Sequence, residues 1–307
     1  MRNTSLIEWE LALEERYKNM YQKISEENLK KLQAAYLDMF LKFQSECDLL
    51  NIKPFMVAGT LIGSVRHKGF IPWDDDIDLV VFREDYEKLK LAFKENREFD
   101  LVLPESDKKS IHKMLKVQSK TLTLYDILGE GFSKNKFLYL DLLPIDYVPE
   151  SMLVANLKGK VLKLMDLSYS SSRCYPRYSK HLDYMSKGSL ELRINLFLRR
   201  IVGLPAILLG PDNLFKLMER LLCSTTKTSK ITIAYGVKGY FGEIVDYDTF
   251  YPPKQYVFEN HMFWGPNNAH KYLENRYGDY MQLPSEKEQK ERHVRLRDDW
   301  EGRVIRN

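Results

Sequence analysis

Four of the five residues at positions 74 to 78 are aspartates, and an apolar run follows them directly. In an extended chain the side chains alternate between two faces, so Asp76 and Asp78 point the same way, while Ile77 and Leu79 point into the core. Two carboxylates on one face repel each other and are costly to remove from water. A divalent cation with oxygen ligands relieves that repulsion. The pattern predicts a metal site on Asp76 and Asp78, with Mg²⁺ favoured and Mn²⁺ as the alternative.

Two ordinary explanations of an acidic run fit this segment less well. An EF-hand loop requires Gly at its sixth position and Glu at its twelfth, where this chain has Leu79 and Asp85. A solvated acidic loop needs neither Trp73 in front of it nor an alternating apolar strand behind it. Both explanations are therefore set aside in favour of a metal site.

A third carboxylate stands within another apolar segment. Asp141 lies between Leu140 and Leu142 in the sequence FLYLDLL, where a charged side chain is hard to justify without a function. It is expected either to share the metal or to act as a general base. The competing explanation is a buried ion pair with an arginine or lysine. Asp146, five residues on, is the weaker candidate.

The segments around these aspartates alternate between helix and strand patterns. Apolar spacing predicts a helix from residue 5 to about 50, a buried strand ending at Gly59, and a helix from Thr60 to Val65 with Thr60 as its cap. A loop follows up to Trp73. Strands are then expected at 76–82, 100–103, 113–119, 122–125 and 137–143, with a helix at 84–96.

The pattern changes after residue 150. Residues 150–225 are predominantly helical, with a loop expected over the basic, Ser- and Tyr-rich stretch at 168–181. Strand- and loop-like sequence returns at Ile231, and a last helix is expected from about Glu286. The prediction is an α+β fold with a helical segment at 1–50, a mixed-sheet catalytic core at 51–150, and a mainly helical region at 151–307. The last region would complete the active site on the acceptor side, and the three parts could form one continuous domain.

Charge and cysteine content exclude some classes of function. The 307 residues carry a net formal charge of only +4, with basic and acidic residues interleaved, which is no signature of nucleic-acid binding. Three widely spaced cysteines form neither a zinc motif nor a disulfide framework. The N-terminus has glutamates where a signal peptide needs an apolar core, so a cytoplasmic protein is expected.

One segment could contact a membrane. A spanning helix needs roughly 20 consecutive apolar residues, and the nearest candidate, Ile194 to Gly210, is interrupted by Arg199, Arg200 and Pro205. It fits a helix lying in the membrane interface with its arginines at the headgroups. It fits a buried helical hairpin equally well.

The longer sequence around the aspartates resembles a known family. A Gly-Thr turn followed by a strand with Asp-x-Asp is similar to the nucleotidyltransferase fold, although the gap between turn and aspartates is longer than usual. The stretch GTLIGSVRHKGFIPWDDDIDLVVFREDYEKL resembles the LicD family almost residue for residue. LYLDLLPIDYVPE, YPPKQYVFEN and ENRYGDYMQLPSEKEQKERH resemble further family blocks. The likeness runs from Lys53 to His293 and is loose over 150–230.

The resemblance implies a reaction and an acceptor. Members transfer a phospho-alcohol, typically phosphocholine, from a CDP-linked donor to a sugar hydroxyl of a cell-surface glycan such as teichoic acid, lipopolysaccharide or capsule. The acceptor would be lipid-linked and met at the inner face of the membrane. A donor with glycerol or ribitol is the alternative within the fold, and nucleotidylation of a protein or antibiotic is a more remote one. A degenerate binding module in a glycan-assembly complex is the non-enzyme alternative.

The resemblance also assigns roles to further residues. The phosphate-facing turn and helix start would be formed by Gly59, Thr60, Gly63 and Ser64. Positive groups for the pyrophosphate would come from Arg66 and Lys68. His67 is either a further such group or an exposed loop residue, and Lys116 either reaches a phosphate or is a solvated strand lysine. Asp74 and Asp75 would orient the metal ligands or cap the loop, and Trp73 would pack or contact the donor. Tyr277, Gly278 and His293 match the family's last block without an assigned chemistry, and the aromatic insert at 175–184 could contact the glycan.

Overall fold

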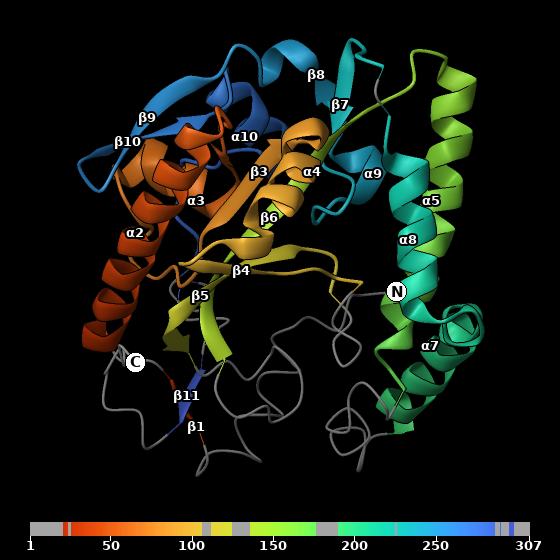
Figure 1. The fold of residues 1–307 in the computed structure, drawn as a ribbon. Coiled ribbons are helices and arrows are strands. Elements are labelled where there is room, and N and C mark those ends of the chain that lie inside the picture. The colour runs from red at the N-terminus through yellow and green to blue at the C-terminus, as the bar shows by residue number, and fades with distance from the viewer. Residues whose placement is uncertain are drawn as a thin grey trace.

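A mixed β-sheet forms the centre of the molecule (Figure 1). The computed structural model describes residues 21–23, 26–105, 112–124, 136–175, 190–224, 226–285, 289 and 295–297. The seven-stranded sheet has the order β2-β3-β6-β5-β4, with β7 paired to β6 and β8 paired to β7. Its strands are β2 (Phe55–Met56), β3 (Asp78–Phe82), β4 (Phe99–Val102), β5 (Leu115–Leu124), β6 (Lys136–Tyr147), β7 (Lys230–Thr232) and β8 (Val245–Asp246). Only β3 and β6 pair in parallel; the other pairs in this sheet are antiparallel.

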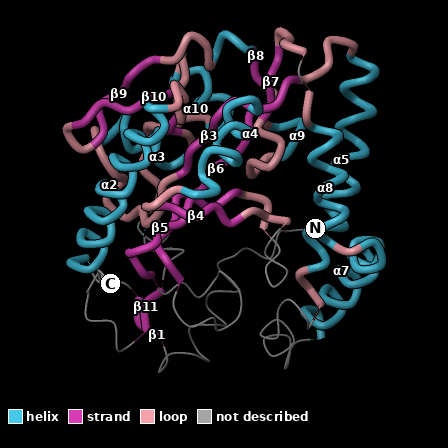
Figure 2. Tube along the Cα trace, in the orientation of Figure 1, coloured by secondary structure: helices cyan, strands magenta, loops and turns pink. Residues whose placement is uncertain are grey.

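Helices and a hairpin cover the sheet near β3 (Figure 2). The elements are α2 (Glu26–Leu49), α3 (Ala58–Ile62), α4 (Arg83–Ala92), the hairpin β9 (Lys254–Phe258) and β10 (His261–Gly265), and α10 (Ala269–Tyr277). A π-helical turn, Gly63–His67, continues α3, and 3₁₀ turns lie at Phe93–Glu95 and Tyr247–Thr249. Phe40 of α2 stacks on Phe263 of β10 with ring centres 3.9 Å apart, so residues more than 200 positions apart share one core.

A second group of helices stands beside the sheet, at the right of Figure 1. It comprises α5 (Met152–Ser172), α7 (Leu190–Leu209) and α8 (Pro211–Leu222), with the short α9 (Gly239–Gly242) nearby. Among the described residues, no single helix is long and apolar enough to cross a bilayer. The segments Arg193–Leu209 and Pro211–Leu222 are long and apolar enough only when taken together, and the chain bends by 84° between them.

A buried ionic cluster joins the two groups of elements. Arg83 of α4 donates from Nε and Nη2 to the two carboxylate oxygens of Asp146 on β6, at 2.7 and 2.8 Å. Its Nη1 donates to Glu219 of α8 at 2.7 Å. Burial opposes the charge on the guanidinium, but the two carboxylates dominate and raise the pKa of Arg83. The cluster fixes α8 against the sheet and gives Asp146, the weaker catalytic candidate, a structural contact.

The α+β fold with a mixed sheet flanked by helices is confirmed, and most predicted elements are present. The predicted helix at 5–50 is confirmed over Glu26–Leu49, but Tyr21–Lys23 is instead a short strand, β1, paired with β11 (Arg295–Arg297). The same pairing shows that the predicted C-terminal helix does not include 295–297. Residues 1–20 and 286–288 lie outside the described part of the chain.

Three local predictions need correction. The helix near Thr60 begins at Ala58, so Thr60 lies inside it rather than at its cap. Asp76 precedes the strand, which begins at Asp78. The predicted loop at 168–181 is wrong over its first residues, because Ser168–Ser172 form the last turns of α5, where three serines and Tyr169 are buried.

Candidate active site

Three predicted site residues lie in one row across the sheet. Asp78 of β3 pairs in register with Asp141 of β6, and Asp141 pairs in register with Lys116 of β5. Residues that pair across neighbouring strands project from the same face of a sheet. The parallel pairing of β3 and β6 therefore brings together two aspartates that are 63 positions apart in the sequence, with a lysine next to them.

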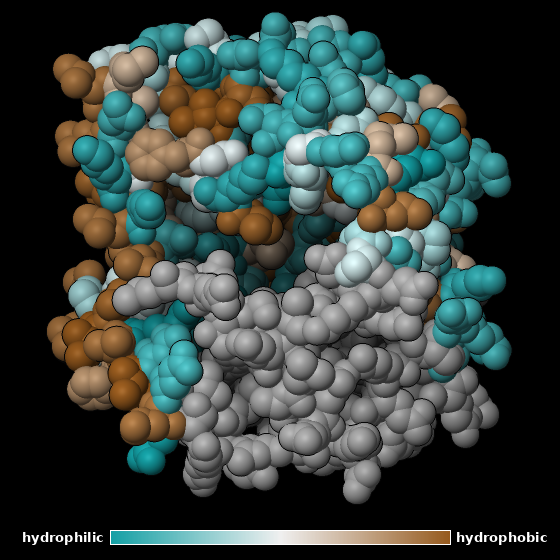
Figure 3. All heavy atoms as spheres, turned by 180° about the vertical axis from the view of Figure 1, so that it is seen from behind, coloured by the Kyte–Doolittle hydropathy of each residue, from teal (hydrophilic) through white to brown (hydrophobic). Residues whose placement is uncertain are grey.

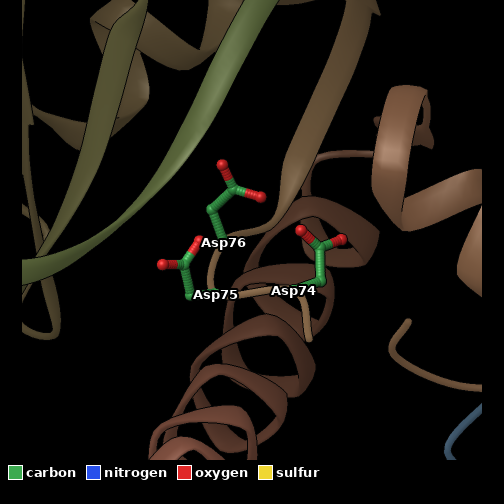
Figure 4. A group of neighbouring side chains, drawn as sticks. All are labelled: Asp74, Asp75 and Asp76. Atoms are coloured by element: carbon green, nitrogen blue, oxygen red, sulfur yellow. The ribbon is translucent and has the colours of Figure 1, made fainter. Parts of the chain in front are cut away.

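Three more carboxylates lie in the loop that leads into β3. One oxygen or more from each of Asp74, Asp75 and Asp76 lies within 4.8 Å of the others, a separation compatible with a shared cation. Figure 4 shows these three carboxylates side by side along the loop. Asp75 is 1% exposed, whereas Asp74 and Asp76 are half-buried.

The acidic groups of the loop and the strand act on one another. Burial raises the pKa of Asp78 well above its usual range, and nearby charges raise it further, in the order Asp76, Asp141 and Asp74. Burial also raises the pKa of Asp74, reinforced by the charges of Asp76 and Asp75. Ionisation of Asp78 and of Asp74 is therefore opposed by the carboxylates around them.

The residues present fit a divalent cation. The Oδ2 atom of Asp74 is buried and has no hydrogen-bond partner among the described residues. An acceptor of this kind costs free energy unless a cation or donor satisfies it. Carboxylate oxygens are the ligands that Mg²⁺ and Mn²⁺ prefer. Asp74, which the sequence suggested only as a supporting residue, belongs with the candidate ligands.

Gly59 and Thr60, in the first turn of α3, hold the start of β3. The hydroxyl oxygen of Thr60 accepts a hydrogen bond from the backbone N–H of Asp78 at 2.9 Å, and Val57 N–H donates to the carbonyl of Asp78 at 3.2 Å. A Cβ atom on Gly59 would lie 2.8 Å from Asp74 Oδ2. These contacts position the aspartates; contact of the turn with phosphate stays a prediction.

Gly63 and Ser64 make contacts within the protein. A Cβ atom on Gly63 would lie only 2.4 Å from the carbonyl oxygen of Gly69, so only glycine allows the loop to pass so close to the helix. The buried hydroxyl of Ser64 donates to the carbonyl of Val257 on β9 at 2.8 Å. Both residues hold the site's loop against its surroundings, and a role in donor binding is untested.

The basic residues of the loop are held in several ways. Arg66 donates to the carbonyl of Tyr280 at 2.7 Å and to Nε2 of His67 at 2.9 Å, so its guanidinium fastens the loop to the C-terminal segment. Burial, together with the charge of Arg66, lowers the pKa of His67. Lys68 is exposed and has a left-handed backbone, with φ of 62°. Trp73 is half-buried and meets the ring of His67 edge to face.

Lys116 is turned toward an aromatic ring. Its Nζ lies 3.9 Å from the ring centre of Tyr139, which stands two residues before Asp141 on β6. Side chains two positions apart on a strand share a face. Lys116 therefore has a defined position beside the aspartate row rather than the freedom of a solvated lysine.

The sequence did not single out Arg276, at the end of α10. Its charge lowers the pKa of Asp78, against the effect of the neighbouring carboxylates. The guanidinium is anchored by Glu243 and by a hydrogen bond from its Nε to the hydroxyl of Tyr277 at 2.9 Å. It lies in the block ENRYGDY that matched the family, and an arginine in that block was the available signal. His293 and residues 176–184 lie outside the described residues.

Comparison with known proteins agrees with this geometry. Residues 51–178 match the family model described as LicD/FKTN/FKRP, nucleotidyltransferase domain. The chain is 27% identical over 282 residues to the lipopolysaccharide cholinephosphotransferase LicD of Haemophilus influenzae, covering 87% of this chain and 96% of that protein. It is 27% identical over 211 residues to an uncharacterized protein of Rickettsia prowazekii, covering 62% of this chain and 74% of that protein. The resemblance found in the sequence is thereby confirmed: residues 51–178, which carry Asp78, Asp141 and Lys116, match the LicD/FKTN/FKRP nucleotidyltransferase-domain model.

Proposed function

We propose that the protein is a metal-dependent transferase that moves phosphocholine from CDP-choline to a sugar hydroxyl of a cell-surface glycan. The observation that carries the proposal is the row of Asp78, Asp141 and Lys116, joined by the acidic loop at Asp74 to Asp76. The Haemophilus influenzae relative, a lipopolysaccharide cholinephosphotransferase, supports both the transferred group and the glycan acceptor.

The side chains of the site match what phosphoryl transfer requires. Asp76, Asp78 and Asp141 would hold Mg²⁺, with Asp74 as a further ligand. When bound, the ion would neutralise charge on the donor's phosphate oxygens. Asp141 would serve either as a ligand or as the base that accepts the proton of the attacking hydroxyl.

Positive side chains close to the aspartates would offset the negative charge of the donor's pyrophosphate. Lys116 pairs in register with Asp141, and Arg276 is close enough to Asp78 to influence its pKa. Arg66 and Lys68 are the other cations that we propose for donor binding. The guanidinium of Arg66 already donates a hydrogen bond to the carbonyl of Tyr280.

Other donors and acceptors define the alternatives. The same site would serve a CDP-linked glycerol or ribitol, since the metal and the pyrophosphate are common to all three donors. The glycan could be lipopolysaccharide, teichoic acid or a capsule precursor, lipid-linked and met at the inner face of the membrane. Ile194 to Gly210 is the segment proposed to contact lipid there. A binding module without catalysis has no need of so many carboxylates beside two cations.

Ligand-dependent thermal stability tests the proposal. A ligand that binds only the native state raises stability by about 2.7 kcal/mol at 100 times its dissociation constant. CDP-choline, CDP-glycerol, CDP-ribitol, CTP and ATP are compared with and without Mg²⁺. We expect a Mg²⁺-dependent rise with CDP-choline that Asp76→Asn/Asp78→Asn abolishes.

The matched control is Asp100→Asn, whose side chain is 66% exposed on β4. It should retain the shift. A Mg²⁺-dependent shift with CDP-glycerol or CDP-ribitol instead of CDP-choline would identify a different donor. The proposed class of reaction would stand. No shift with any nucleotide, with or without a glycan acceptor, would contradict the transferase.

A further inference from the structure

An ordinary surface helix turns its large apolar side chains toward the core, whereas α7 turns most of its own toward solvent. Leu196, Gly203 and Ala206 are buried, and they form the narrow side that packs on α5. A Cβ atom on Gly203 would lie 2.8 Å from the backbone carbon of Ser171, and Ala206 N–H donates to the hydroxyl of Ser168 at 3.1 Å. The helix is therefore attached to α5 through small residues, and its large apolar side chains lie elsewhere.

Those large side chains face outward. A stripe at intervals of three and four residues is 45–77% exposed and consists of Ile194, Phe197, Ile201, Leu204 and Leu208. This spacing places them on one face of a helix. In a globular protein such a stripe normally faces the core, and a large exposed apolar face marks an interaction surface.

Helix α5 also exposes large apolar side chains. Leu153, Leu157 and Leu164 are 82%, 65% and 69% exposed and lie on the part of α5 that precedes its contact with α7. In all, the two helices expose seven large apolar side chains on α5 and nine on α7. Figure 3, seen from behind, shows hydrophobic side chains along its left edge, on the side where these helices lie.

The charges on these helices favour an anionic partner. Together α5 and α7 carry six lysines and arginines against two acids, and one of the acids, Asp166, is paired with Lys113 at 2.9 Å. The exposed basic side chains next to the apolar ones are Arg193 on α7 and Lys160 and Lys163 on α5, whereas Arg200 is half-buried and donates to the carbonyl of Cys174 at 2.8 Å. A second copy packed on this surface about a two-fold axis would bring like charges together.

We propose that α5 and α7 form a docking surface for an anionic lipid bilayer, with the apolar stripe inserted among the acyl chains and Arg193, Lys160 and Lys163 at the headgroups. Both requirements of an interfacial helix are met, a wide apolar face and a basic flank. The structure thus favours the interfacial alternative for Ile194 to Gly210 over a buried hairpin. This surface is separate from the aspartate row and does not depend on the proposed reaction.

Vesicle co-sedimentation of the full chain tests the surface. The vesicles are phosphatidylcholine alone and phosphatidylcholine mixed with phosphatidylglycerol, with neither nucleotide nor glycan present. We expect binding to the anionic vesicles, reduced by about tenfold for each inserted side chain lost in Phe197→Asn/Ile201→Asn/Leu208→Asn. Arg193→Gln/Lys160→Gln/Lys163→Gln should weaken binding about fivefold for each charge, and less at high salt.

A matched control carries the same chemical change outside the surface. Leu49, Leu91 and Val237 are 81%, 67% and 92% exposed, and their replacement by Asn should leave binding unchanged. Circular dichroism and the thermal midpoint establish that each variant is folded. Absence of wild-type binding, or equal loss in the control, would overturn the proposal. So would a stable wild-type dimer that the α7 variant converts to a monomer, because the occupant would then be a second copy.

Discussion

At the scale of single residues, the site depends on close packing around its carboxylates. Gly59 lies against Asp74 with no room for a side chain, and Thr60 holds the backbone of Asp78. The carboxylates themselves are held at a cost, since burial and mutual repulsion both raise the pKa of Asp78. Two substitutions separate these effects.

Replacement of Gly59 by Ala should impair metal binding far more than stability. The added Cβ would lie 2.8 Å from Asp74 Oδ2, closer than real contacts allow, so the carboxylate must move. We expect at least about tenfold weaker Mg²⁺ binding by titration, and a loss of unfolding free energy below about 1 kcal/mol in urea. The same substitution in an Asp74→Ala background should have little further effect on Mg²⁺ binding; an undiminished effect would show that it acts elsewhere.

Replacement of Asp78 by Asn should stabilise the metal-free protein. The amide removes a buried charge among like charges, and its NH₂ can donate to a neighbouring carboxylate. We expect a gain of about 1 kcal/mol in urea unfolding with EDTA. We also expect Mg²⁺ to stabilise the wild type and not this variant.

The control for that variant is Asp146→Asn. This aspartate is also buried, but it is paired with Arg83, so the same change should destabilise the protein. Equal signs for the two variants would contradict the distinction between a repelling carboxylate and a paired one.

At the scale of elements, the tip of the β9–β10 hairpin shapes the loop before the aspartates. Glu259 N–H donates to the carbonyl of Lys68 at 2.8 Å, and its side-chain oxygen accepts from the N–H of Phe70 at 3.0 Å. A Cβ on Gly69 would collide with that side chain. A hairpin nearly 190 residues away therefore sets the conformation of the loop.

Glu259→Ala should loosen this loop. It leaves the N–H of Phe70 without its acceptor, at a cost of about 1–3 kcal/mol in unfolding free energy, and transferase activity should fall with it. Glu259→Gln retains the acceptor oxygen and should retain most of both. Urea unfolding and activity on the same preparations make the comparison, and equal behaviour of the two variants would rule out the hydrogen bond as the cause.

Site residues that stand out from their immediate neighbours could be predicted from the sequence. Residues whose partners lie far along the chain could not. Asp76 and Asp78 stand out because aspartates cluster directly before an apolar run, and Asp141 stands out because it interrupts one. Local patterns also reveal the strands that carry Asp78 and Asp141. Glu259 and Arg276 do not stand out, because their importance comes from partners on distant elements. The strand at Tyr21–Lys23 and the helical turns at Ser168–Ser172 were missed because partners elsewhere in the chain determine them.

At the scale of the whole molecule, one arginine connects the sheet to the helices beside it. Arg83 contacts Asp146 on β6 and Glu219 on α8, and its side chain is 3% exposed. Asp146 also pairs through its backbone with Thr232 of β7, so strands from both halves of the chain meet there.

Arg83→Met should destabilise the protein by about 3–5 kcal/mol, because two partly or fully buried carboxylates lose their counter-charge. The thermal midpoint should fall accordingly. The triple change Arg83→Met/Asp146→Asn/Glu219→Gln removes the charges together and should recover part of the loss. A triple variant less stable than the single one would contradict this account.

The contacts of Arg83 limit where the chain can be cut into a fragment that keeps its structure. The stretch that matches the family ends at residue 178, yet Glu219 and the strands β7 and β8 lie beyond it. A fragment ending there would expose an unmatched ionic group and the open edge of β6. The unit that could be exchanged between chains without breaking these contacts is therefore larger than the stretch that matches the family, and it includes the helices through α8 and the strands after them.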